Sequence, residues 1–569
     1  MAEVITNEPI MLDETGKEIV AALKDLSRGG DSVSIDALYQ GMLTGENTTK
    51  VFSTWWGLSD NGKDTKYQRL ERWFTMLSKL WAGKKYTLRY YKDSVSNDSA
   101  MTPLDDLADK TAAQLCTEST TPVADWADED PMTWYIRANA LSLADGTMNV
   151  LAIEGESEFD ISGETAPVWT FCLALWKREW DSGDYSYKSW ATTNPGGYIP
   201  YAGDVAPDNT KRIMTWRPTF PGGLTSDGLR LTSGSGKKPY LWTSATTGLA
   251  RARAMDAYEG LWNDADAIWV LDMWQLRHFN LENSNICEGC QSYNFQYKCA
   301  VAESYVTRVI LTTAQASNLQ VGSNVEIGEK NENTNNDRNQ TDSYNIARYA
   351  KIISIDEETI NETTYAAVNV EVDSPFTTTE NTLVSTMPWD SGNTEGLPGH
   401  KDGACYSLTA GRNPLRVQGV EMMSGAYDIG LDPLYQVTAS DESNKWNYAI
   451  YECRDSENLS GSITGNYELT GLAYSKMQQG WNYVKKFFRT AKAILFPETV
   501  GGSTSGWFKS GFGGANSAGV RCPWRCGRLS NGASAGLAYE AGDVTPSGSS
   551  WYGRPRLSGS GKKRGVWAA

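Results

Sequence analysis

Apolar side chains recur at helical spacing in the first part of the chain. The strongest pattern covers 67–82, where apolar residues three and four positions apart form one broad stripe that ends before Gly83. A weaker stripe predicts a short amphipathic helix over 13–28, and the polar, acidic segment further on predicts another helix over 104–115. We expect the helix over 67–82 to bury its stripe in the protein.

The pattern changes to that of strands after Met132. Runs such as TWYIRANALSL and APVWTFCLALWKREW alternate apolar and polar positions, as half-buried strands do. Helical spacing returns over 249–261, and the run GWNYVKKFFRTAKAILFP at 480–497 fits either a helix or a strand. Over 302–386, short β-rich runs are separated by polar turns, which predicts a small β-barrel or sandwich inserted into the body.

These patterns divide the chain into four parts. Residues 1–125 form an N-terminal region that ends in a polar hinge, and 126–301 form the first half of the body. The β-rich insert occupies 302–386, and the second half of the body occupies 387–569. The prediction for the whole chain is an α+β fold with a β-rich inserted domain.

The end of the second half, 503–569, has an unusual composition. Gly, Ser, Ala and Asn dominate, and large residues occur singly among them. Disordered tails are poor in aromatic residues, whereas Tyr and Trp among small polar residues are typical of binding loops. From Trp507 to Ala569 there are nine Lys or Arg and two acidic residues, which gives 9 − 2 = +7, while the whole chain carries −17. This favours an ordered surface for an acidic or glycan-like partner; the alternative is a lobe that packs on the body.

The same stretch resembles a known family. Its runs LFPETVGGSTSGWF, CGRLSNGASAGLAYEAG and GRPRLSG resemble the C-terminal variable region of phage receptor-binding proteins of the tropism-determinant type. Those proteins carry a C-type-lectin fold of the formylglycine-generating-enzyme type, and in many of them a diversity-generating retroelement rewrites this region. The resemblance implies a fixed frame with displayed residues between its positions. The matching frame positions are Gly527, Asn531, Gly532, Ala535, Gly536, Leu537, Gly553, Arg556 and Leu557.

A second run, PLRVQGVEMMSGAYDIGLDPLYQV, resembles the central signature of the same fold. The matching positions are Arg416, Gly419, Val420, Glu421, Gly425 and Ala426. The run departs from the family pattern at Met422 and Tyr427. In the related enzymes this region supports cation binding, so the departures argue against a bound metal, and we predict neither a metal nor another cofactor.

The resemblance implies a phage virion adhesin, in a tail or head fibre, that binds a host-cell surface receptor non-covalently. The receptor would be a glycan or a protein. Residues 1–125 would contact other virion proteins, and a homotrimer would supply avidity. The predicted receptor-binding residues lie in the display stretch and are Trp507, Phe508, Phe512, Trp524, Arg528, Leu529, Ser530, Ser534, Tyr539, Trp551, Tyr552 and Arg554.

Composition argues against several other classes. No run of 18 apolar residues occurs, so we expect no membrane insertion. The acidic balance argues against nucleic acid as the main partner. The first residues lack the basic start and apolar core of a signal peptide, so we expect most of the nine cysteines to be reduced.

Motifs for catalysis are sparse. The chain has two histidines, which excludes a three-histidine iron site, and it contains no GxSxG nucleophile motif. A zinc site is conceivable, with buried thiols as the alternative; its candidate ligands are Cys287, Cys290, Cys299 and His278. Cys522 and Cys526 resemble the copper-binding pair of sulfatase-modifying relatives, at a spacing one residue shorter. We predict no enzyme activity; the alternatives are a structural virion component, such as a baseplate or capsid decoration, and an oxidase of the formylglycine-generating type.

Overall fold

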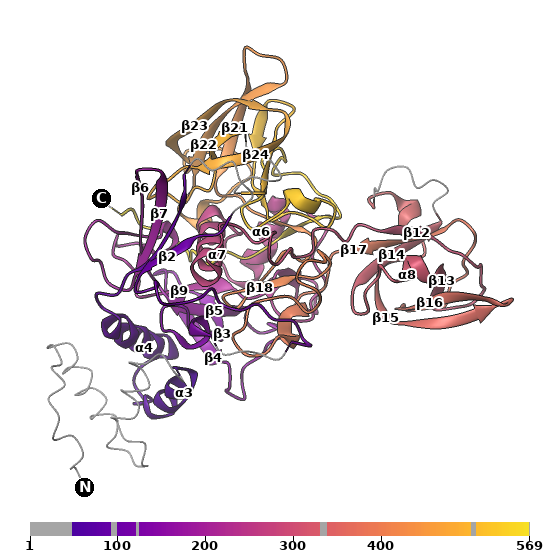
Figure 1. The fold of residues 1–569 in the computed structure, drawn as a ribbon, viewed down its shortest axis with the longest axis horizontal. Helices are drawn as coiled ribbons and strands as arrows, with labels where there is room; N and C mark the ends of the chain where they lie inside the picture. Colours follow the sequence, from indigo (N-terminus) through magenta and orange to yellow (C-terminus); the bar gives the residue numbers. More distant parts are fainter. Residues whose placement is uncertain (1–47, 93–98, 121–124, 330–337, 502–507, 568–569) are drawn as a thin grey trace, which may run out of the picture.

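A large body carries two projecting lobes, one built from the insert and one from a sheet of the C-terminal half (Figure 1). The computed structural model describes residues 48–92, 99–120, 125–329, 338–501 and 508–567. The helix predicted over 13–28 lies outside these residues. The fold class is α+β, as predicted, with mostly antiparallel sheets.

The helix predicted over 67–82 is confirmed as α4 (Lys66–Leu80). Thr65 caps its first turn through a capping box with Gln68, and its apolar stripe is buried. The preceding helix α3 (Thr48–Leu58) packs on α4, with the ring of Phe52 5.1 Å from that of Trp73. Both helices lie on the same side of the body (Figure 1).

The N-terminal region is not set apart from the body by a hinge. Strand β1 (Tyr86–Tyr91) pairs along its length with β7 (Tyr185–Ala191), so residues on both sides of the predicted boundary at 125 share one sheet. The helix predicted over 104–115 is also wrong, because β2 (Thr102–Asp105) pairs with β1 there and turns follow. The alternation of large apolar or aromatic residues with polar ones in YTLRYY and YSYKSWA was the sequence signal for this sheet.

The first half of the body is built mainly from two sheets and two long helices. The sheet of β1, β2 and β7 also holds β6 (Trp176–Ser182) and β8 (Ile199–Pro200). A second sheet has the order β4-β3-β5-β9, formed by Met148–Ile153, Tyr135–Ser142, Val168–Leu173 and Met214–Pro218. Short elements complete this half: α5 (Trp126–Glu129), β10 (Gly222–Leu224) and β11 (Leu231–Ser233). The helix predicted over 249–261 is α6 (Ala245–Met255), shifted towards the N-terminus because Ser244 caps it.

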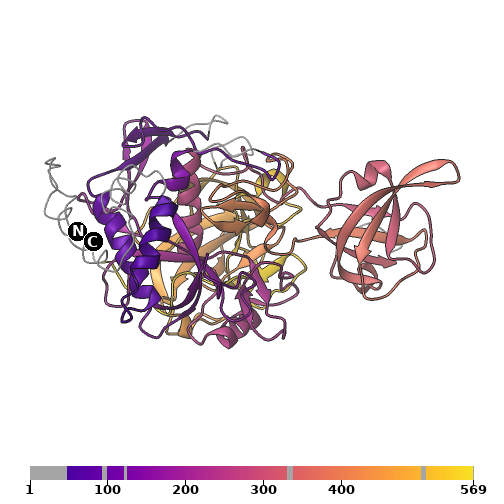
Figure 2. The same cartoon turned by 90° about the horizontal axis from the view of Figure 1, so that it is seen from below.

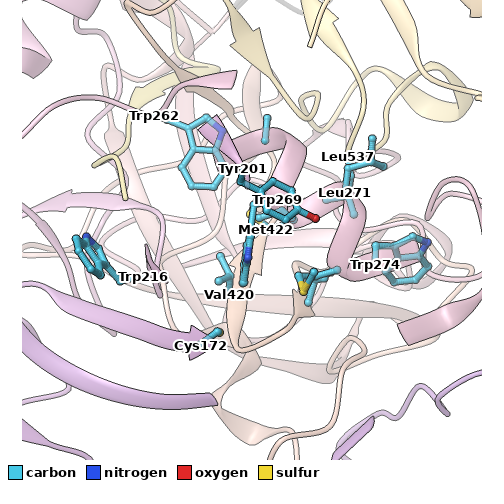
Figure 3. Close-up of a cluster of buried hydrophobic side chains, with 14 of the residues drawn as sticks. Cys172, Tyr201, Trp216, Trp262, Trp269, Leu271, Trp274, Val420, Met422 and Leu537 are labelled. Carbon is cyan, nitrogen blue, oxygen red and sulfur yellow. The ribbon is translucent and has the colours of Figure 1, made fainter. Parts of the chain in front are cut away.

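Helix α7 (Asp264–His278) runs through the centre of the body. Every residue of α7 except Ile268 is buried. Its tryptophans pack in the core, where Figure 3 shows Trp269 and Trp274 with Trp262 and strand residues such as Val420. Its buried charges are paired, for example Asp266 with Arg217 at 3.1 Å. A helix that is buried all round needs such pairing, since unpaired buried charges are costly.

The β-rich insert is confirmed, with slightly wider bounds than predicted. Its sheet has the order β12-β17-β14-β15-β16-β13 and its own apolar core. The elements are β12 (Gln296–Lys298), β13 (Arg308–Thr312), α8 (Thr313–Ala316), β14 (Asn324–Glu329), β15 (Ala347–Ile360), β16 (Thr363–Glu371) and β17 (Thr382–Met387). Figures 1 and 2 both show it projecting from the body.

The C-terminal half contains two interleaved sheets and the short antiparallel pair β18-β19. The larger has the order β25-β24-β26-β29-β28-β20-β30, and the smaller β23-β22-β21-β27. The run 480–497, which fitted a helix or a strand, begins as strand β24. The elements of this half are β18 (Leu415–Val417), β19 (Val420–Met422), β20 (Tyr427–Ile429), β21 (Leu434–Ala439), β22 (Lys445–Glu452), β23 (Glu468–Gln478), β24 (Gly480–Phe487), β25 (Pro497–Val500), β26 (Gly511–Gly514), β27 (Gly519–Arg521), β28 (Trp524–Arg525), β29 (Glu540–Ala541) and β30 (Gly553–Pro555). Among the described residues, no helix is both long and apolar enough to cross a membrane.

Candidate ligand-binding surface

Small residues let the loops of the display stretch cross at close range. Gly527 has a φ of 91°, and a Cβ there would lie 2.5 Å from the Cβ of Ala535. A Cβ at Gly553 would overlap the ring of Trp524, and one at Gly536 would overlap the hydroxyl of Ser510. Because no larger side chain fits at these positions, the glycines of the predicted frame have a structural reason to be there.

Buried ion pairs fix the display stretch to the rest of the body. Arg554 and Arg556 both bind the carboxylate of Asp428, each at 3.1 Å. Arg525 pairs with Glu540 at 2.8 Å and also with Asp264 at the start of α7. These charges are almost completely buried, so the pairs hold the frame in one arrangement.

This pairing corrects the prediction of a basic surface. Arg525, Arg554, Arg556 and Arg564 account for four of the nine cations in the stretch, and each pairs with a buried acid. Three of those acids come from outside the stretch, at Asp264, Asp428 and Asp432. The count of +7 therefore overstates the charge that this part of the protein presents to a partner.

Most of the predicted receptor-binding residues are not at the surface. Trp507 lies outside the described residues. Seven side chains are buried, at Phe508, Phe512, Trp524, Leu529, Tyr539, Trp551 and Arg554. Four are partly exposed, at Arg528, Ser530, Ser534 and Tyr552. The buried seven cannot touch a receptor in this conformation, but two of them, Trp524 and Trp551, pack directly on the partly exposed Tyr552.

A ladder of aromatic rings connects these buried side chains to the surface. The rings of Tyr427 and Tyr539 stack at 5.6 Å with an angle of 8° between their planes. At one end, Trp481 packs on Tyr539 at 5.4 Å and is 52% exposed. At the other end, Tyr552 packs edge-on against Tyr427, and the guanidinium of Arg528 lies 3.9 Å above the Tyr552 ring. The ladder holds one exposed aromatic group, Trp481, and one partly exposed group, Tyr552, on a buried core.

Asn531 fixes the loop between these groups. Its side-chain oxygen accepts hydrogen bonds from the backbone N–H of Arg528 at 2.7 Å and from the hydroxyl of Tyr427 at 2.9 Å. The loop therefore presents Ser530 and Ser534 at a fixed place beside the ladder. We define the display surface as Trp481, Arg528, Ser530, Asn531, Ser534 and Tyr552.

Trp481 is the residue that sequence reasoning missed. It lies in the run 480–497, ahead of the display stretch, and its strand pairs with β26 inside that stretch. The alternation in GWNYV, with Asn482 and Val484 buried and Trp481 exposed, was the available signal. The display surface can bind a ligand by ring stacking, by hydroxyl hydrogen bonds and through one guanidinium, without covalent chemistry.

The surroundings of the cysteines do not suit either the zinc site or the copper site considered above. His278 is engaged by Asp402 at 3.0 Å, and among the described residues no cluster of His, Cys, Asp and Glu could hold a metal ion. Cys522 and Cys526 are buried free thiols, and burial raises the pKa of each to about 12. A thiol that stays protonated at neutral pH is a poor nucleophile and metal ligand.

A buried carboxyl group beneath the display loops predicts a pH dependence of stability. Burial raises the pKa of Glu282 to about 7, and its oxygens accept hydrogen bonds from Ser284 close to Gly536. Because the folded state holds this proton to a higher pH than the unfolded state, its contribution to stability falls as pH rises from about 4.5 to about 7. We expect Glu282→Gln to remove this contribution, so that the loss of melting temperature between pH 5 and pH 8 becomes smaller than in the wild type. Equal pH profiles for the two proteins would contradict this.

A scan against protein-family models and a search of the curated proteins both find no match to the chain.

Proposed function

We propose that this protein is a phage virion adhesin that binds a host-cell surface receptor non-covalently through the display surface. The observation that carries the proposal is a pair of aromatic groups, the exposed Trp481 and the partly exposed Tyr552–Arg528 stack, at the two ends of a buried ring ladder. Rigid aromatic groups on a preorganised frame are the usual anchors of binding surfaces, because little conformational entropy is lost on binding.

The wider setting of the proposal is a tail or head fibre. A C-type-lectin-like body would display the surface, and residues 1–125 would contact other virion proteins. A homotrimer would raise the avidity of an individually weak site. An elongated monomer by light scattering would argue against the trimer and leave the binding site itself in place.

The test is binding of purified protein to host cells. Trp481→Ala, Arg528→Ala and Tyr552→Ala are each expected to lower affinity about thirtyfold, the effect of losing one anchor worth about 2 kcal/mol. The melting temperature should change little, because these side chains are partly exposed.

The matched control is Tyr305→Ala in the insert. Tyr305 is 82% exposed and lies far along the chain from the display surface. The Tyr305→Ala variant should bind cells as the wild type does. If Tyr305→Ala lowers affinity for cells as much as the display variants do, or if all three display variants bind as the wild type does, the receptor site does not lie at the display surface.

The structural-component alternative has a test of its own. Shielding of Trp524 and Trp551 in the particle does not discriminate, because both are already buried within the chain. Trp481 is the informative probe: quenching of its fluorescence in intact particles supports an outward-facing adhesin, whereas shielding supports a subunit contact. The oxidase alternative is disfavoured by the protonated, buried thiols of Cys522 and Cys526.

A further inference from the structure

A cavity lies on the body away from the display surface. Its volume is about 520 Å³, and its walls come from the sheet of β1, β6 and β7, from helix α7 and from residues 485–495. Tyr201 and Leu271, both labelled in Figure 3, line it. The size falls within the range of small-molecule sites.

The strand periodicity explains the polar wall. In β6 and β7, alternate residues face opposite sides of the sheet, and the set that includes Lys177, Glu179 and Lys188 faces the cavity. Asp272 of α7 accepts contacts from Lys177 at 2.6 Å and Lys188 at 2.8 Å. The hydroxyl of Tyr201 donates to the same carboxylate at 2.9 Å.

The charges of the whole cavity leave it positive, and the excess comes from Lys92 and from the segment 485–492. Seven Lys or Arg side chains and three carboxylates line the cavity. The acids are matched by Lys177, Lys188 and Arg489, which pairs with Asp181 at 2.7 Å. Within the described part of the chain, Lys92, Lys485 and Lys492 form no ion pair. In a protein of net charge −17 this is a local excess of cations, which attracts an anion.

The cavity also has an apolar and aromatic lining. Phe487 and Phe508 meet edge-on at 5.0 Å, and Ile268, Leu271 and Leu495 are further apolar lining residues. Aromatic side chains together with an excess of cations suit a ligand that carries a negative group on a ring, because the ring covers the apolar side chains while the anion meets the lysines.

We propose that this cavity binds a ring-bearing organic oxyanion of the size of one or two sugar residues, such as a uronic acid. The site is separate from the display surface: the two share no residue, and along β24 Trp481 lies four residues, or roughly 13 Å, from Lys485, the lining residue of that strand nearest to it. The inference is therefore independent of the proposed receptor-binding function.

The experiment measures binding of D-glucuronate, glucose and inorganic phosphate to the full chain by calorimetry and ligand-observed NMR. Glucuronate should bind, and glucose and phosphate should each bind at least about tenfold more weakly, because each lacks one of the two recognised features. Phosphate binding equal to that of glucuronate would overturn recognition of the ring, and equal glucose binding would overturn recognition of the anion.

Variants locate the site. The double variant Lys485→Gln, Lys492→Gln is expected to weaken glucuronate binding about tenfold or more, whereas Lys63→Gln, at an exposed lysine before α4, should leave it unchanged. Trp481→Ala should also leave it unchanged. No glucuronate binding by the wild type, unchanged binding by the double variant, or loss with Trp481→Ala would each overturn the proposal.

Discussion

Replacement of Asp428 by asparagine is expected to destabilise the protein by about 3–5 kcal/mol. The carboxylate of Asp428 binds two guanidinium groups, those of Arg554 and Arg556, and all three side chains are at most 1% exposed. Asparagine keeps the shape but removes the charge, so two buried cations lose their partner. The measurement is thermal unfolding by calorimetry, with limited proteolysis of the display loops as a second readout.

The control for this variant is Asp441→Asn. Asp441 forms an ion pair with Lys476 at 3.0 Å, but its side chain is 76% exposed. Solvent screens such a pair, so the loss should be less than about 1 kcal/mol. Similar melting temperatures for Asp428→Asn and the wild type would show that the buried pairs do not hold the display stretch in place.

The periodic elements could be predicted from the sequence because their signals are local. The apolar stripe of α4 and the alternation in β3 and β22 depend only on neighbouring residues. The insert was also visible, since its short strands and polar turns differ from the chain on either side. Its edges moved by a few residues because β12 and β17 extend beyond the change in composition.

The roles of single residues in the display stretch could not be predicted because their partners are distant in the sequence. Arg554 counts as a surface cation until Asp428, 126 residues earlier, is placed beside it. Trp524 and Tyr539 look like displayed aromatics until Tyr427 is seen to pack against both of them and against Tyr552. Conversely, Trp481 falls outside the stretch and reaches the surface only because β24 pairs with β26.

Alanine variants of Trp524 and Trp481 therefore compare a buried supporting ring with an exposed one. Trp524 is 1% exposed and packs against Tyr427 and Tyr552, at ring distances of 5.8 and 6.0 Å. Trp524→Ala is expected to cost about 3–5 kcal/mol of stability, because it removes a large buried side chain and leaves a cavity. Trp481→Ala removes a half-exposed ring and should cost less than about 1 kcal/mol.

In cell binding, the direct effect of the substitution is expected at Trp481 and not at Trp524. Trp481→Ala is expected to lose affinity about thirtyfold while its melting temperature holds, since the ring is an anchor and not part of the core. Trp524→Ala should lose binding only in parallel with folding, and binding should recover at temperatures well below its lowered melting point. If Trp524→Ala instead loses binding with its melting temperature intact, the buried ring contacts the receptor through a conformation other than this one, and the display surface must be redrawn around it.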